Sequence, residues 1–586
     1  MTASWKNSRL VQRVCGLVHS IPPIAWLLAG FFIFLTPHAY RYVKHHPDER
    51  HYTDAAIEMV ESGDYLTPKT IQGELRLRKP ILTYWMVASS YLTLGISPFA
   101  SRLPFLLAGV AIIWLTYRLA WYLFDDQQIG LVAGLIVSCQ PAVLISSPRS
   151  IPDIFLALGL LVSTHGFVRL LRGATSDWWS IGLASIGAAL AVETKGLPAV
   201  VFVVCGFGML LLFRRDSLMR AWKQYLVGAA VGISLGLSWF VIMFYLHGET
   251  LLAEFFGDQI VKQLDYDRFA FAIHLPQVFL LALICFLPWW LPTMTRPQAW
   301  RRALPSSWDP ACLLLGIWCV VYLILASCVN RVNLRYQVPV VPLLSVLTAG
   351  LLSAIPTNDL RSHFVRLSRL AAIAVVIAAL SGIGICLASG AWTGLIATGI
   401  ICLGVIALAT RLSRLPWQQV GVSGVLTLLL ISPISYFSAR AIATQSVEER
   451  LLEKVKIMEE ASRPIGFLTK HSYPSRLRVL SGGEVTAHWL GRDLDRTKQP
   501  LPIGEYDVLV LTEDDAQQVD LSEFNVKLVD NGLGKLKVAE LLGAVVHGQL
   551  PSYLGQRRRN LAYAVRRPQA MAQTIPVAHG PATNIR

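Results

Sequence analysis

Apolar runs of about 18 or more residues recur along the chain from Ile21 to Ala439. Each is long enough to cross a hydrocarbon core of roughly 30 Å as an α-helix. Only 15% of the residues are charged and 54% are hydrophobic, which is not the composition of a soluble protein of 586 residues. The sequence therefore predicts a multi-pass α-helical membrane domain over residues 1–440.

Beyond Arg440 the sequence is mixed and charged, as in an ordinary soluble domain. We predict that residues 441–567 form a small α/β domain, and that the Pro-, Ala- and Gln-rich end, 568–586, is a disordered tail. Short runs rich in β-forming residues, separated by turn signals, predict the strands of this domain. These runs are 465–468, 477–480, 506–511 and 526–528.

The basic residues predict how the chain is oriented in the membrane. The net charge is +15, but Lys and Arg lie mostly in short loops between the apolar runs, where they set topology. We therefore expect the lipid bilayer, and no nucleic acid, as the partner of these charges. Lys6, Arg9 and Arg13 precede the first apolar run and place the N-terminus in the cytoplasm.

The segment 80–98 decides between two topologies. If it spans the membrane, the basic loops at 214–223 and 296–302 fall outside, against the positive-inside rule. If it lies in the interface as an amphipathic helix, the basic loops become cytoplasmic, and the loop 42–101 and the C-terminal domain lie outside. This second topology is the one we predict. Its thirteen spanning helices are expected at 21–41, 103–124, 129–147, 152–171, 177–193, 196–213, 224–246, 275–294, 310–329, 336–355, 370–389, 391–410 and 420–439.

Charged and aromatic residues gather on the predicted outer face, in loops of the kind where functional residues concentrate. The alternative for each is an ordinary solvated surface residue, and for Asp153 it is a helix N-cap. Ionisable groups at the membrane are costly, which favours a functional role. The candidates are Asp48, Glu49, His51, Tyr52 and Lys79 in the first outer loop, and Arg149, Asp153, Lys195, Lys262, Arg335 and Tyr336 in later outer segments.

Several of these residues stand in short motifs that follow one another in a fixed order. The motifs are Asp48-Glu49, Lys79-Pro80, Ser101-Arg102-Leu103-Pro104, Pro152-Asp153, Lys195-Gly196 and Arg335-Tyr336 with Pro339. With this set the chain resembles, over residues 20–345, the superfamily of bacterial aminoarabinose (lipid A) transferases and protein O-mannosyltransferases. The resemblance implies a GT-C fold in the bacterial inner membrane. It also implies transfer of a sugar, with inversion, from a polyprenyl-phosphate donor to lipid A, a glycolipid or a protein in the periplasm.

Two positions depart from the pattern of the aminoarabinose transferases. Arg78-Lys79-Pro80-Ile81 stands where Glu-Lys-Pro-Pro is typical, and His51 stands where an Arg usually follows the acidic pair. Both lie near the expected sugar and phosphate contacts. They leave the class of reaction unchanged and put the aminoarabinose substrate in doubt.

Sugar transfer needs a base for the acceptor and cations for the leaving lipid phosphate. Asp48, which His and Arg side chains flank in the sequence, is expected to be the base. Asp153 is expected to position the acceptor or the sugar, and Glu49 to orient its neighbours. The residues expected to bind the substrates are Lys79, Arg335, Lys195, Arg149, Tyr336, Lys262, His51 and Tyr52.

Two questions stay open from the sequence. No cofactor is predicted, but an acidic pair can bind Mg²⁺ or Mn²⁺ and His45-His46 could bind zinc, so a divalent metal is an alternative. A lipid or solute transporter or flippase is the alternative function. Transporters place polar residues near the bilayer midplane and often contain internal repeats, whereas these charges gather at one face without an evident repeat, which favours the enzyme.

Overall fold

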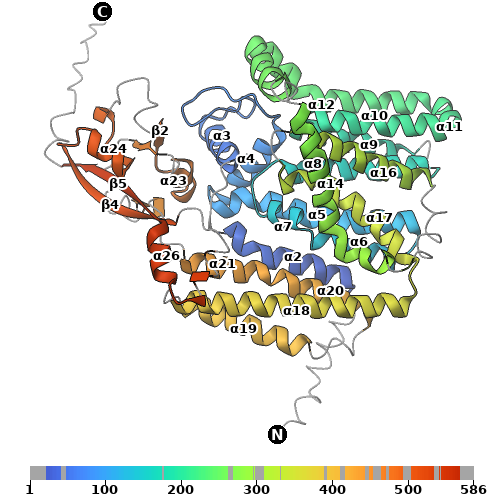
Figure 1. Cartoon of the computed structure of the whole chain (residues 1–586). Helices are drawn as coiled ribbons and strands as arrows, with labels where there is room; N and C mark the ends of the chain where they lie inside the picture. Colours follow the sequence, from blue (N-terminus) through green and yellow to red (C-terminus); the bar gives the residue numbers. More distant parts are fainter. Residues whose placement is uncertain are drawn as a thin grey trace, which may run out of the picture. The chain divides into compact units, whose positions relative to one another are not determined.

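A computed structural model gives the fold (Figure 1). It describes residues 21–40, 48–173, 177–261, 268–294, 296, 309–329, 332–388, 392–409, 416–442, 448–449, 451–452, 464–469, 474–491, 503–533, 540, 543–544 and 546–567. The chain forms two compact units. The helical unit comprises residues 1–68, 75–94 and 98–439, and the C-terminal unit comprises 69–74, 95–97 and 440–586.

The helical unit is built almost entirely from helices that follow the apolar runs of the sequence (Figure 1). Its elements are α2 (Pro23–Tyr40), α3 (Glu49–Ser62), α4 (Leu82–Leu94), α5 (Pro98–Phe124), α6 (Gln127–Ser138), α7 (Pro141–Ser146), α8 (Asp153–Leu171), α9 (Trp178–Lys195), α10 (Leu197–Phe213), α11 (Arg215–Arg220), α12 (Trp222–Leu251), the π-helix η2 (Leu252–Val261), α14 (Arg268–Met294), α16 (Pro310–Ser327), the short 3₁₀ helix η3 (Leu334–Gln337), α17 (Val341–Ser353), α18 (Thr357–Ala388), α19 (Trp392–Ala409), α20 (Trp417–Leu429) and α21 (Ile431–Ile442).

The multi-pass helical membrane fold predicted from the sequence is confirmed. Among the described residues, eight helical stretches are long and apolar enough to cross a membrane. Each of the thirteen predicted spans corresponds to one helix or to two consecutive helices. The span predicted at 129–147 is divided into α6 and α7 at Cys139 and Gln140, and that at 420–439 into α20 and α21. The number of crossings therefore stays a prediction.

The segment 42–101, predicted to lie outside, contains two helices, α3 and α4, which pack together at one end of the long helices (Figure 1). Helix α4 has 13 residues, which at 1.5 Å per residue is about 20 Å, too short to span. This length fits the interfacial helix predicted at 80–98. The sequence did not predict the helix at 49–62, α3, which ends at Gly63 in the left-handed conformation (φ 74°).

Helices α8 and α9 approach each other closely because small residues line their contact. A Cβ atom added at Gly166 would lie 2.3 Å from the backbone nitrogen of Ala184, and one at Gly187 would lie 2.3 Å from that of Ser163. The Ser163 hydroxyl donates to the Ala184 carbonyl at 2.9 Å. This antiparallel contact sets the N-terminus of α8 beside the C-terminus of α9, and those two ends carry Asp153 and Lys195.

The C-terminal unit contains one five-stranded sheet in the order β2-β1-β3-β5-β4. Strand β1 is parallel to β2 and β3, whereas β5 is antiparallel to β3 and β4. The predicted α/β class is confirmed, but the strand expected at 477–480 is wrong, because these residues belong to helix α23. The tail 568–586 lies outside the described residues. The elements are β1 (Ile465–Leu468), α23 (Pro474–Leu480), β2 (Ala487–Gly491), η6 (Ile503–Glu505), β3 (Val508–Thr512), α24 (Glu513–Gln518), β4 (Phe524–Leu533), α26 (Leu550–Arg557) and β5 (Arg558–Arg566).

Candidate active site

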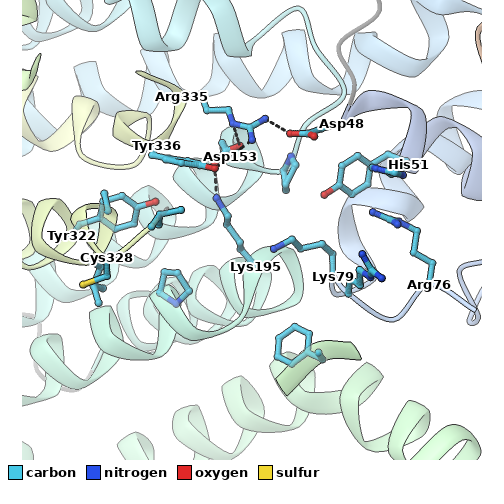
Figure 2. Close-up of a pocket in the computed structure, with 18 residues that line it drawn as sticks. Asp48, His51, Arg76, Lys79, Asp153, Lys195, Tyr322, Cys328, Arg335 and Tyr336 are labelled. Atoms are coloured by element: carbon cyan, nitrogen blue, oxygen red, sulfur yellow. Dashed lines mark hydrogen bonds and ion pairs between the residues drawn. The ribbon is translucent and has the colours of Figure 1, made fainter. Parts of the chain in front are cut away.

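A cavity of about 470 Å³ lies among the ends of α3, α8, α9 and α16, the 76–79 segment, η2 and η3. Eight of the predicted site residues line it, together with others described below (Figure 2). All of them belong to the helical unit. The predicted residues in the lining are Asp48, His51, Tyr52, Lys79, Asp153, Lys195, Arg335 and Tyr336.

Two carboxylates and two cations form a continuous chain in this cavity (Figure 2). Arg335 donates from Nη1 to Asp48 Oδ2 at 2.5 Å, and its Nε lies 4.0 Å from Asp153 Oδ2. Lys195 Nζ donates to Asp153 Oδ1 at 2.6 Å. Tyr336 completes the group, since the Lys195 ammonium and the Arg335 guanidinium lie 5.0 and 5.2 Å from its ring centroid. Arg335 thus links Asp48 and Asp153, two of the three carboxylates predicted for the site.

The two carboxylates differ in exposure. The Asp153 side chain is 2% exposed, whereas that of Asp48 is 43% exposed. Asp153 is the first residue of α8, where the helix dipole favours a negative charge. It is not the N-cap, because Pro152 occupies that position and no side-chain capping bond forms. A buried carboxylate held by two cations is suited to fix their positions, and the accessible Asp48 is suited to meet a substrate.

The opposite wall of the cavity is cationic. Arg76, Arg78 and Lys79 line it, so the lining holds five Lys or Arg residues against two carboxylates. Burial, with a smaller contribution from Lys195, lowers the pKa of Lys79 to about 7. An anionic ligand would relieve this excess of positive charge. The cavity is therefore built to take an anion.

The surroundings lower the pKa of His51 and raise the pKa of Arg335. Burial and the neighbouring Arg76 and Arg50 lower the pKa of His51 to about 3, so its imidazole is neutral at physiological pH. For Arg335, burial alone would lower the pKa, but Asp153, Tyr336 and Asp48 together raise it. The positive charge of the cavity therefore comes from Lys and Arg, and His51 can act only as a neutral hydrogen-bonding group.

Glu49, the neighbour of Asp48, does not line the cavity. Its side chain is fully buried and accepts from Arg102, with Nε–Oε1 2.8 Å and Nη2–Oε2 2.6 Å. The Ser150 backbone N–H donates to Glu49 Oε1 at 2.9 Å, and Arg102 Nη1 donates to the His38 carbonyl at 2.6 Å. A buried carboxylate in such an ion pair has no access to a substrate, and the role expected for Glu49, to orient its neighbours, stays a prediction.

One further predicted residue is placed elsewhere, one is not described, and the surroundings of Tyr52 can be added. Arg149 lines a different cavity and not this one, which corrects its assignment to the same phosphate. Lys262 lies outside the described residues. Tyr52 is buried against Tyr84, with ring centroids 5.1 Å apart, and burial raises its pKa.

Several lining residues were not singled out from the sequence. Arg76 and Arg78 are part of the basic run before Pro80, which was the available signal. Phe255 and Tyr322 come from η2 and α16 and carry no pattern that sets them apart. Glu254 Oε2 accepts from the Leu77 backbone N–H at 2.9 Å and so joins η2 to the basic run.

A metal was left open by the sequence. Among the described residues, no group of three or more His, Cys, Asp or Glu side chains is arranged to hold a metal ion. Asp48 and Asp153 are both engaged by cations, and His45-His46 lies outside the described part of the chain. The acidic residues of the cavity do not fit a metal site, and we derive no step through one.

Comparison with known proteins connects this geometry to a family. Residues 78–241 match the family model described as dolichyl-phosphate-mannose-protein mannosyltransferase. An undecaprenyl phosphate-alpha-4-amino-4-deoxy-L-arabinose arabinosyl transferase of Edwardsiella ictaluri (strain 93-146) is 27% identical over 387 residues, 63% of this chain and 67% of the relative. An uncharacterized protein of Aquifex aeolicus (strain VF5) is 28% identical over 322 residues, 53% of this chain and 59% of the relative. The chain thus spans less than two thirds of that relative's length.

The fold comparison covers more of the chain. The crystal structure of ArnT from Cupriavidus metallidurans bound to undecaprenyl phosphate matches with a TM-score of 0.66. The match covers 92% of this chain and 97% of that chain at 17% sequence identity. The chain therefore has the GT-C fold of ArnT. The family model and the sequence relatives, in turn, confirm the resemblance to polyprenyl-phosphate-sugar glycosyltransferases that the motifs indicate.

Proposed function

We propose that this protein transfers a sugar from a polyprenyl-phosphate donor to a lipid A, glycolipid or protein acceptor at the periplasmic face of the bacterial inner membrane. One observation carries the proposal: a single cavity gathers an accessible carboxylate, Asp48, and an excess of cations. The reaction that uses both is displacement of a lipid phosphate from a sugar by an acceptor.

The donor phosphate is assigned to Lys79, Lys195 and Arg335, with Tyr336 as a further hydrogen-bonding group. Arg335 can bind phosphate with two donors, whereas the lysines act as point charges. When the bond between the sugar and the phosphate oxygen breaks, negative charge grows on the polyprenyl phosphate. Preorganised cations bind the donor phosphate and stabilise the charge that grows on it.

Asp48 is assigned as the base. Its carboxylate is held by Arg335. A donor phosphate on Arg335 competes for the same guanidinium and frees Asp48 to accept the proton of the attacking acceptor group. Asp153, which is buried and bound to Lys195, keeps the phosphate-binding cations in place. Glu49 is assigned as a positioning residue that acts through the backbone of Asp48 and the Ser150 segment.

The orientation is supported by charge alone. The segments that carry the cavity residues are those that the positive-inside rule puts outside, and the basic loop at 214–223 is at the other side. A polyprenyl-linked donor is suited to a compartment without nucleotide sugars. The C-terminal unit, which follows the last predicted span, is assigned to the same side.

Reconstitution of the full chain in vesicles tests the proposal. The vesicles contain a radiolabelled polyprenyl-phosphate sugar and extracted envelope lipids or proteins as acceptors. We expect label to move to one acceptor fraction, and Asp48→Asn to reduce the rate by about 10²–10⁴-fold while donor binding persists. If the wild-type chain moves the donor lipid between leaflets without transferring label, and Asp48→Asn leaves that movement unchanged, the protein is a flippase and the proposal fails.

A further inference from the structure

A second cavity, of about 530 Å³, lies in the helical unit away from the residues assigned to sugar transfer. Its walls come from α2, α7 and the junction of α20 with α21 (Figure 1). Most of the lining is apolar and includes Leu35, Ile145, Leu428 and Ile431. Because α2 and the stretch from Trp417 to Arg440 are both apolar enough to span the membrane, these walls are suited to hydrocarbon chains.

The polar lining of this cavity is cationic and contains no Asp or Glu. Arg102 lines it, but its charge is balanced by Glu49. Arg149 also lines it, and within the described part of the chain no ion pair or hydrogen bond engages its guanidinium. Burial lowers the pKa of Arg149, the charge of Glu49 opposes this shift, and the charges of Arg102 and Arg335 add to it. Glu49 is itself bonded to Arg102, so an anion in the cavity would stabilise the half-buried Arg149 guanidinium beside the apolar walls.

We infer that this cavity binds an anionic membrane lipid, with its phosphate on Arg149 and its chains along α2, α7 and the α20–α21 junction. Charge complementarity selects the headgroup, since the lining of the cavity offers two arginines and no carboxylate. The apolar walls select a lipid over a free anion. The inference does not depend on the proposed function, because it rests on residues that do not line the transfer cavity.

The bound lipid would lie close to residues that line the transfer cavity. Arg149 belongs to the segment between α7 and α8, and the next residue, Ser150, donates its backbone N–H to Glu49. Asp153 is four positions after Arg149 and faces the transfer cavity. One short segment therefore separates the two sites, and lipid bound on Arg149 stabilises the conformation that presents Asp153.

Photo-crosslinking in nanodiscs tests this site. The full chain is placed in phosphatidylcholine nanodiscs with a trace of phosphatidylglycerol that carries a photoreactive acyl chain, and labelled peptides are identified by mass spectrometry. We expect labelling of peptides that contain Leu144–Ile145 and Leu428–Ile431. Arg149→Gln should reduce it by at least about tenfold, as expected for loss of a charge-assisted hydrogen bond. Arg149→Lys should retain part of it.

Two controls keep the result interpretable. Arg215→Gln makes the same change in an exposed residue of α11 and should leave the labelling intact. Ile145→Trp fills the apolar wall without touching Arg149 and should also reduce labelling, which guards against misfolding of Arg149→Gln as the cause. Equal labelling by a phosphatidylcholine analogue, or unchanged labelling in Arg149→Gln, would overturn the inference. So would displacement by millimolar inorganic phosphate as effective as that by unlabelled phosphatidylglycerol, because the apolar walls would then contribute nothing.

Discussion

Asp48 and Glu49 are neighbours in the sequence, yet they belong to two regions with opposite properties. Glu49 sits in a buried anchor, defined here as Glu49, Arg102 and Ser150, in which both carboxylate oxygens are satisfied. Asp48 lies in the transfer cavity, where its carboxylate is 43% exposed and shares Arg335 with Asp153. The buried ion pair of Glu49 stabilises the local structure. The accessible carboxylate of Asp48 shares its cation, so a substrate can take its place on Arg335. The following changes test that distinction.

After Asp48→Asn, the largest effect on transfer is expected from Asp153→Asn. The variant keeps the size of the side chain but removes the charge that fixes Lys195, so the phosphate-binding cations shift. A misplacement of about 1 Å can cost roughly 10²-fold in rate. We expect kcat to fall by about that factor while the donor KM changes little, measured with the reconstituted enzyme. Asp126→Asn, at the N-terminus of α6 away from the cavity, is the matched control and should leave kcat unchanged.

The largest effect on stability is expected from Arg102→Met. It leaves the buried Glu49 carboxylate without its partner, which typically costs about 3–5 kcal/mol. Thermal unfolding of the purified protein in detergent should show a clear drop in Tm. The double variant Glu49→Gln/Arg102→Met should recover part of it, because no buried charge is left unpaired. If Arg102→Met alone has the wild-type Tm, the buried anchor does not stabilise the fold.

A smaller effect, confined to donor binding, is expected from Lys79→Met. Loss of one cation from the phosphate site should raise the donor KM by about 10–10²-fold, with a modest change in kcat. Lys79→Arg should restore part of the affinity. A fall in kcat at unchanged KM would place Lys79 in the chemical step instead.

The smallest effect is a pH dependence of donor affinity. Burial lowers the pKa of Lys79 to about 7. A bound phosphodiester, which is anionic, would raise this pKa. The charged form therefore binds the donor, and affinity should be greatest below pH 7 and decline as the pH rises through it. Between pH 6 and pH 8 the Kd should increase by about tenfold. His51, with a pKa of about 3, does not titrate in this range, so Lys79→Arg should give a flat profile.

The sequence predicted the membrane helices and most of the transfer cavity for clear physical reasons. Long apolar runs are stable in a bilayer as helices. Ionisable side chains at the ends of such helices are energetically unfavourable, which identified Asp153, Lys195 and Arg335 as site candidates. The direction of Glu49 was not predictable in this way, since consecutive residues at a helix start point about 100° apart. Residues 49–62 also lack a strong apolar signal, so α3 was missed.

The positions of other residues depend on tertiary contacts, which the local sequence pattern does not predict. Arg149 stands four positions before Asp153, but the turn between α7 and α8 carries its side chain to the second cavity. Phe255 reaches the transfer cavity because Glu254 is bonded to the Leu77 backbone. The short run 477–480 has strand-like composition, and its helical form in α23 is set by packing within the C-terminal unit, where Leu477 and Val479 are buried.

Labelling of an introduced cysteine tests the central claim most directly. Asp48→Cys, in a chain whose native cysteines are replaced by serine or alanine, is exposed to a membrane-impermeant thiol reagent in sealed vesicles of known orientation. We expect modification from the periplasmic side only, and protection by added polyprenyl phosphate, whose headgroup would occupy Arg335 beside residue 48. Modification from the cytoplasmic side, or periplasmic modification that polyprenyl phosphate does not slow, would contradict a lipid-phosphate site on the outer face.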